Sequence, residues 1–336
     1  MREVPVDISF QIDKEFAEIY KRRAEEIHSV LCELSETTSW ENKIKILKKY
    51  LHLKRELDPG KSRHKIFHNV IMKEIKIEVQ NEALDGLILW PREYTKQIPC
   101  IYFIHGGGLM VGSFYDNLVQ LSDLCLKLGI ALFAIDYRLA PEFQYPVPLQ
   151  DCFTGLSWLM DNASGFGIDT NRIILMGESA GGALAASLAL MLKDKDLQWL
   201  RGLILLSPML DPRNTTKSSH QFKDGWPFWP REFNVTAWTS YLGSDTKRFD
   251  QDPYSNIFTA KDLEGFPVTY VEVGNIDLFR DETIEFVKLL AENGNDVTFH
   301  LFSKMFHGMD SLIPQSERVR RILDLRIKEI KSLFRL

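Results

Sequence analysis

The stretch 173–193, IILMGESAGGALAASLALMLK, changes at Ser179 from branched apolar residues to small ones. Residues 173–176 are typical of a buried strand, and residues 180–193 are typical of a buried helix. Between them, GESAG at 177–181 matches G-x-S-x-G, the motif of a serine on a sharp strand-to-helix turn. Side chains two residues either side of such a serine would collide, so glycine occupies both places. The motif predicts a nucleophilic serine, with a turn that merely caps a helix as the alternative.

Further apolar runs repeat along the chain. The predicted strands are 70–79, 86–90, 100–104, 130–135, 173–176, 203–206, 268–273 and 297–302. Helical stretches separate most of them, at 116–128, 147–162, 180–193 and 282–293. Because strands alternate with helices, the chain is predicted to form an α/β fold with a mostly parallel central sheet and helices on both faces.

Two regions fall outside this alternation. The first sixty residues have apolar side chains at helical spacing, and Thr38 with Glu41 matches a capping box at the start of a second helix. Asp58-Pro59-Gly60 is predicted to end this helical region. Residues 211–250 are rich in tryptophan and phenylalanine, so they are predicted to leave the sheet instead of forming another strand-helix unit.

The composition excludes some classes of partner. The chain has 336 residues with a net charge of -5, and this mild acidity provides no general attraction for nucleic acid or anionic lipid. Apolar runs are shorter than the roughly 20 residues of a membrane-spanning helix, and residues 1–16 have no signal-peptide core. The four cysteines show neither a C-x-x-C pair nor metal-ligand spacing. We therefore expect a cytoplasmic protein with no membrane span and no metal site.

A second motif, His105-Gly106-Gly107-Gly108, follows the predicted strand 100–104. Three consecutive glycines allow backbone N–H groups to turn inward and approach a ligand closely. Such amides stabilise the oxyanion of a tetrahedral intermediate. For this motif alone, an ordinary flexible loop is the alternative. The two motifs together are complementary, because one provides a nucleophile and the other provides hydrogen-bond donors.

A nucleophilic serine needs a base, and the base needs an acid that orients it. Both are expected after Ser179, in loops beyond strand ends, in the order acid then histidine. Asp277 follows the predicted strand 268–273, and His307 follows the strand 297–302. We therefore predict Asp277 as the orienting acid and His307 as the general base.

Three other residues compete for these roles. Asp281 lies at the predicted entrance of the helix 282–293, where helix capping is the simpler function. His300 lies inside a predicted strand, which favours packing over catalysis. His220 lies in the excursion and is a candidate for substrate contact.

Taken together, these motifs resemble those of the hormone-sensitive-lipase-like (family IV) esterases of the α/β hydrolases. The resemblance runs from about residue 73 to the C-terminus. It is carried by five blocks, namely HGGG at 105–108, DYRLAPE at 136–142, GESAGG at 177–182, DLFRDE at 277–282 and FHG at 306–308. Two departures from the family pattern are Glu178, where aspartate is common, and Leu109-Met110, where an aromatic residue often follows the glycines.

The resemblance implies an esterase of the α/β-hydrolase fold that uses no cofactor. Ser179, Asp277 and His307 would form the triad, and the amides of Gly107, Gly108 and Ala180 would form the oxyanion hole. His105 would brace its own loop. Residues 1–60 would contribute helices to a cap over a catalytic domain at 61–336, with a cap insertion at about 211–250.

The substrate is expected to be a small ester with a short acyl chain, from acetyl to roughly hexanoyl, again by resemblance. Leu109 would form part of the pocket wall. Trp226 and Phe228 either line an apolar pocket or hold the cap together. A non-catalytic small-molecule receptor on the same fold is the alternative function, and the presence of His307 argues against it.

The last predicted helix, 317–336, is amphipathic and basic. Packing on the sheet is a better explanation for its apolar face than attachment to a membrane surface. The chain is expected to be a monomer or a homodimer.

Overall fold

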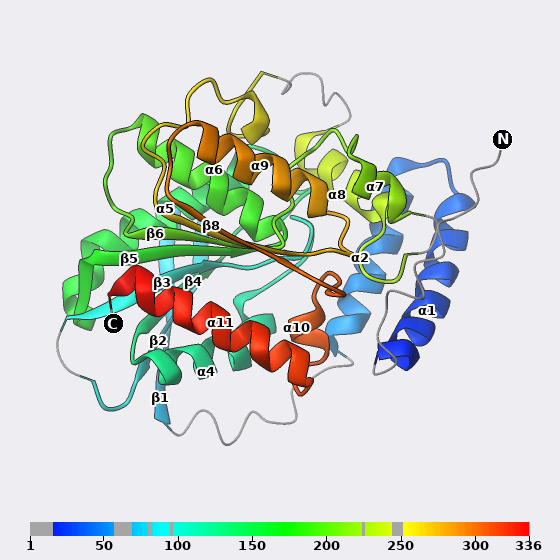
Figure 1. The fold of residues 1–336 in the computed structure, drawn as a ribbon. Coiled ribbons are helices and arrows are strands. Elements are labelled where there is room, and N and C mark those ends of the chain that lie inside the picture. The colour runs from blue at the N-terminus through cyan, green and yellow to red at the C-terminus, as the bar shows by residue number, and fades with distance from the viewer. Residues whose placement is uncertain are drawn as a thin grey trace.

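A central sheet organises the chain (Figure 1). The computed structural model describes residues 16–56, 69–79, 82–94, 97–223, 226–243 and 251–335. Eight strands pair in the order β1-β2-β4-β3-β5-β6-β7-β8. They are β1 (Val70–Val79), β2 (Glu82–Pro91), β3 (Ile98–Ile104), β4 (Ala131–Asp136), β5 (Ile168–Glu178), β6 (Gly202–Leu206), β7 (Thr269–Gly274) and β8 (Val297–Phe302). The β1–β2 and β2–β4 pairings are antiparallel and the others parallel, which confirms the predicted mostly parallel sheet.

Helices cover both faces of the sheet, as predicted. In Figure 1, α4 and α11 lie on one face, and α5, α6 and α9 lie on the other. The helices are α1 (Ala17–Ser35), α2 (Trp40–Glu56), α4 (Leu118–Leu128), α5 (Val147–Asn162), α6 (Ala180–Asp194), α7 (Lys217–Gln221), α8 (Arg231–Leu242), α9 (Arg280–Glu292), α10 (Met309–Leu312) and α11 (Glu317–Phe334). Among the described residues, no helix combines the length and apolar character needed to cross a membrane.

Strand alternation decides which side chains reach which face. In β7, Val271 joins the core on the α6 side, whereas Tyr270 packs in the core that α11 covers. Since successive residues of a strand point to opposite faces, Glu272 points to the same side as Tyr270. A carboxylate is thereby buried on the face of the sheet that α11 covers.

The N-terminal helices and the excursion gather at one end of the sheet, where α1, α2, α7 and α8 lie together in Figure 1. Tyr50 of α2 packs edge-on against Phe233 of α8, with ring centroids 5.7 Å apart. The excursion leaves the sheet, as its aromatic composition predicted, and forms α7 and α8. Residues 1–15, the predicted break at Asp58-Pro59-Gly60, and positions 224, 225 and 244–250 of the excursion lie outside the described residues.

The residue that caps the N-terminus of α2 differs from the predicted one. The helix begins at Trp40, and the Ser39 hydroxyl, not that of Thr38, accepts the amide of Asn42 at 3.3 Å. The predicted capping box at Thr38 was therefore wrong by one residue. Ser and Thr are both good N-caps, so the sequence TTS at 37–39 allowed more than one start.

The C-terminal helix packs on the sheet, as predicted. Ile330 and Phe334 of α11 are buried in the same core as Tyr270, and Val319 and Ile322 near its start are buried as well. Its apolar face is thus covered by the protein itself.

Candidate active site

Ser179 occupies the strand-to-helix turn predicted for it. It lies between β5 and α6 with φ 55° and ψ −120°, a conformation that is unfavourable for a residue with a side chain. Its amide donates to the carbonyl of Leu206 at 2.9 Å, and its carbonyl accepts the amide of Met209 at 3.0 Å. A Cβ on Gly177 would lie 2.2 Å from the carbonyl oxygen of Gly181, so the turn closes only with glycine there.

The structure brings Ser179, His307 and Asp277 together from three separate loops. His307 Nε2 lies 3.0 Å from Ser179 Oγ, and His307 Nδ1 lies 3.0 Å from Asp277 Oδ2. Asp277 is fully buried, and its other oxygen accepts the amide of Phe279 at 3.0 Å. This is the geometry in which an imidazole can take the hydroxyl proton while a carboxylate holds its tautomer.

The electrostatic surroundings of His307 favour its protonated form. Burial alone would lower the pKa of His307, but the Asp277 carboxylate, followed by Glu178 and Asp310, outweighs burial and raises the pKa above its ordinary 6.5. Burial also raises the pKa of Glu178 to about 7, although Asn117 donates to its Oε2 at 2.9 Å. A raised pKa makes the imidazole a stronger base for the hydroxyl proton.

The three competing residues lie elsewhere. Asp281 sits in the first turn of α9, not at its N-cap, and its Oδ2 accepts the amide of Ser218, which ties α7 to α9. His300 stacks on Phe302 within β8, with ring centroids 5.6 Å apart. His220 is exposed on α7.

The glycine loop lies against the nucleophile. A Cβ on Gly106 would lie 3.3 Å from Ser179 Cβ. His105 is buried and stacks on Tyr137, and its Nδ1 contacts the Gly106 carbonyl at 2.7 Å, so its ring is held within the loop. Among the described residues, the amides of Gly107 and Gly108 have no backbone acceptor, and neither has that of Ala180, the first residue of α6. These three donors are therefore available to a ligand.

The residues predicted to contact substrate are buried, Leu109 in this loop and Trp226 and Phe228 in the excursion. Leu109 is fully buried, and its carbonyl accepts the amide of Ala140 at 2.9 Å. Trp226 packs against the rings of Tyr20, Phe222 and Phe228, and 4% of its surface is exposed.

Trp229 is the aromatic residue that lies on the glycine loop, and the sequence did not single it out from its neighbours. A Cβ on Gly108 would lie 2.4 Å from Trp229 Cη2. The indole Nε1 donates to Asn234 Oδ1 at 3.0 Å, so the ring is held in place. Trp229 also has a φ of 68°, which no local sequence signal predicts for tryptophan.

Helix α1 and the residue before it contact both the excursion and the loop that carries His307. Phe16 packs edge-on against Phe306, the residue before His307, at 6.0 Å between centroids. Arg23 Nε donates to the Pro227 carbonyl at 3.3 Å. The first described helix therefore meets the segment that carries the imidazole.

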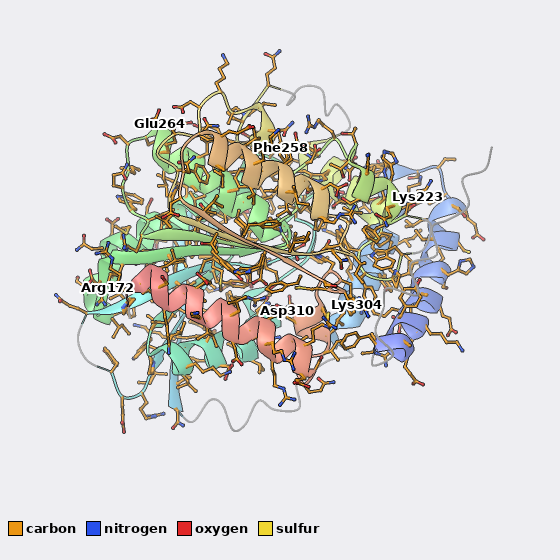
Figure 2. The ribbon with its side chains drawn as sticks, in the orientation of Figure 1. Arg172, Lys223, Phe258, Glu264, Lys304 and Asp310 are labelled. Atoms are coloured by element: carbon orange, nitrogen blue, oxygen red, sulfur yellow. The ribbon has the colours of Figure 1, made fainter. Side chains whose placement is uncertain are left out.

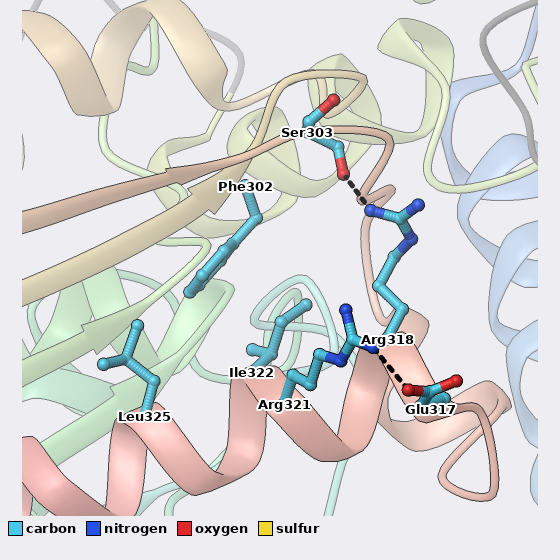
Figure 3. A pocket seen from close by; sticks show the side chains of 7 residues that line it. All are labelled: Phe302, Ser303, Glu317, Arg318, Arg321, Ile322 and Leu325. Atoms are coloured by element: carbon cyan, nitrogen blue, oxygen red, sulfur yellow. Dashed lines mark hydrogen bonds and ion pairs between the residues drawn. The ribbon is translucent and has the colours of Figure 1, made fainter.

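A groove of about 420 Å³ lies away from this site, between the end of β8 and the start of α11 (Figure 3). Phe302, Ile322 and Leu325 form its apolar floor, and the charged pair of Arg321 and Glu317 lies at its rim. It contains none of the three residues of the proposed triad.

Comparisons with known proteins agree with this architecture. The family described as alpha/beta hydrolase fold matches residues 101–311. The arylesterase of Saccharolobus solfataricus is 28% identical over 225 residues, covering 66% of this chain and 71% of that protein. The carboxylic ester hydrolase LipN of Mycobacterium tuberculosis is 31% identical over 226 residues, covering 64% and 58%.

Solved structures show the same fold over nearly the whole chain. A bacterial heroin esterase superposes with a TM-score of 0.81 at 28% identity, covering 91% of this chain and 97% of that chain. The predicted family and fold are thereby confirmed, and the chain belongs to the alpha/beta hydrolase fold family.

Proposed function

We propose that this chain is a serine carboxylester hydrolase in which Ser179 is the nucleophile, His307 the general base and Asp277 the orienting acid. The observation that carries the proposal is the His307 imidazole, which lies 3.0 Å from both Ser179 Oγ and Asp277 Oδ2. The similarity to an arylesterase, a carboxylic ester hydrolase and a heroin esterase supports the esterase class.

The reaction proceeds by two acyl transfers. His307 takes the Ser179 proton as Oγ attacks the ester carbonyl, and the tetrahedral intermediate then expels the alcohol, which receives that proton from His307. Water, deprotonated by the same imidazole, attacks the carbonyl of the acyl-enzyme. The second tetrahedral intermediate then releases the acid, and Ser179 Oγ, the leaving group, takes the proton back from His307. Asp277 stabilises the imidazolium in both halves. Every proton in this cycle moves through groups of the chain, so the proposal includes no cofactor.

The oxyanion of each intermediate is stabilised by the amides of Gly107, Gly108 and Ala180 in this proposal. The absence of a backbone acceptor for these amides, within the described residues, supports the assignment. The N-terminal end of α6 adds a positive dipole end at Ala180. Donors fixed in this way require little reorganisation as charge develops.

The N-terminal helices and residues 211–250 would act as a cap over a catalytic domain at 61–336. Contacts of α1 with Phe306 and of α2 with Phe233 support this division. Ser179 is 6% exposed, so the cap leaves little open space at the nucleophile. A restricted space favours esters with short acyl chains, from acetyl to roughly hexanoyl.

Hydrolysis of a short p-nitrophenyl ester by purified protein tests this proposal. Ser179→Ala is expected to lower kcat by at least about 10⁴-fold. A non-catalytic receptor would bind the ester without turnover in either protein. Turnover that survives in Ser179→Ala would exclude Ser179 as the nucleophile.

A further inference from the structure

A buried cluster of charged side chains lies behind His307, on the face of the sheet that α11 covers. It consists of Arg326 from α11, Glu272 from β7, Asp310 from α10 and Glu178 from the end of β5. Glu272 is 0% exposed and Arg326 is 8% exposed. Buried charges are unfavourable unless opposite charges and hydrogen bonds compensate them, so these groups depend on one another.

Arg326 joins three elements of the fold. Its Nη2 donates to Asp310 Oδ2 at 2.8 Å and also to Glu272 Oε1, and its Nε donates to Glu272 Oε2 at 3.3 Å. The Tyr270 hydroxyl donates to the same Glu272 Oε2 at 2.6 Å. Burial opposes the charge of Arg326, but Glu272 and Asp310 outweigh it and raise the pKa of the guanidinium well above its ordinary value. Arg326 therefore remains a cation that ties α11 and β7 to α10.

Asp310 connects this cluster to the imidazole. It follows His307 by three residues, through Gly308 with φ 70°, and Met309 donates its amide to the Phe306 carbonyl at 3.2 Å. Figure 2 labels Asp310 beside α11. A cavity of about 10 Å³ is lined by His307, Asp310 and Arg326 among others, so the histidine and the cluster share one wall. Because only two residues separate Asp310 from His307, a shift of Asp310 is expected to move the backbone that carries the imidazole.

We propose that Arg326 is a positioning residue for His307, which it holds through Asp310 between Asp277 and Ser179. This inference rests on the proposed function, because it requires His307 to act as the base. The imidazole must keep both contacts in the transition state, whereas ground-state binding of the ester does not require them. Loss of Arg326 therefore lowers kcat and leaves KM nearly unchanged.

The test compares Arg326→Met with Arg326→Lys and with Arg321→Met. Arg321 lies on the same helix, and its side chain is 77% exposed, so it is a matched control. Rates on a short p-nitrophenyl ester are measured on the alkaline plateau, where His307 is neutral in every variant, and well below each unfolding midpoint. We expect Arg326→Met to lower kcat by about 10- to 100-fold with KM changed less than about threefold. Arg326→Lys is expected to recover part of kcat, and Arg321→Met to equal the wild type.

Asp310→Asn gives an independent test if Arg326→Met does not fold. This substitution weakens the ion pair between Arg326 and position 310, and it leaves the ion pair of Arg326 with Glu272 in place. A fall in kcat at constant KM supports the proposal, and wild-type kcat in folded Asp310→Asn or Arg326→Met overturns it. Ser179→Ala, measured in parallel, separates the two claims. If it is inactive while the Arg326 and Asp310 variants are normal, only the positioning role fails, and if it is active the proposed function itself fails.

Discussion

The ring of Phe228 stacks on the ring of Phe306 with centroids 3.7 Å apart and an angle of 14° between planes, and Phe306 directly precedes His307. Phe228 is 1% exposed, so its truncation is expected to leave a cavity beside Phe306. We expect Phe228→Ala to lower the free energy of unfolding by about 3 kcal/mol, measured by urea titration. Leu301→Ala, at a residue that is 45% exposed, should change it by less than about 0.5 kcal/mol. Equal stability of both variants would argue against the stack.

The pH profile reports the charge around His307. The base must be neutral to accept a proton, so kcat/KM falls as the pH drops through its pKa. Because Asp277, Glu178 and Asp310 raise that pKa, the half-maximal point of the free enzyme is expected above pH 6.5.

Glu178→Gln removes the negative charge that Glu178 carries as the pH rises through its own pKa of about 7. The imidazolium is then less stable, the pKa of His307 falls, and the half-maximal point should move to lower pH. Glu264→Gln, at an exposed position, is the control and should leave the profile unchanged. Movement of the Glu178→Gln profile to higher pH would contradict the assigned electrostatics.

The orienting acid is identified by comparing Asp277→Asn with Asp281→Asn. Asparagine at 277 keeps the size of the side chain but stabilises the wrong imidazole tautomer, so kcat should fall by about 10⁴-fold. Asp281 binds the amide of Ser218 instead, and its variant should keep kcat within a few-fold of the wild type. A larger loss in Asp281→Asn than in Asp277→Asn would reverse the assignment.

Trp229 covers Gly108, so its indole is expected to limit the size of the substrate group bound beside the glycine loop. Trp229→Ala should raise the ratio of kcat/KM for a decanoyl ester to that for a butanoyl ester on the order of tenfold. Trp199→Ala, which removes an indole stacked on Phe153 away from the loop, is the control. An unchanged ratio in Trp229→Ala would place the size limit elsewhere.

Much of the fold is predictable from local sequence. Strands such as β1 and β8 and helix α5 have the predicted bounds. Their apolar residues repeat every two residues in a strand and every 3.6 residues in a helix, and both patterns can be read from a short stretch of sequence. The start of α2 was predicted at Thr38 but is capped by Ser39, since adjacent hydroxyl residues have similar capping preferences. The path of α8 depends on long-range aromatic contacts such as that of Phe233 with Tyr50, and α7 is held by hydrogen bonds of Ser218 to Leu278 and Asp281. No local period encodes such contacts.

The site shows the same division. Ser179, Asp277 and His307 were recognisable because motif, strand end and chain order coincide. Trp229 could not be distinguished from Trp226 in the sequence. Only Trp229 lies against Gly108, and this contact joins residues that are far apart in the chain. Arg326 did leave a sequence signal, since it stands four residues from both Ile322 and Ile330 on a buried ridge of α11. The cytoplasmic location and the oligomeric state stay predictions.

Intact-mass measurement after treatment with a fluorophosphonate tests the central claim most directly. A serine hydroxyl activated by His307 is expected to gain one phosphonyl adduct, which peptide mapping should locate on Ser179. Folded Ser179→Ala should gain none, and folded His307→Ala should react far more slowly. An adduct on another residue, or equal labelling of wild type and His307→Ala, would contradict the account.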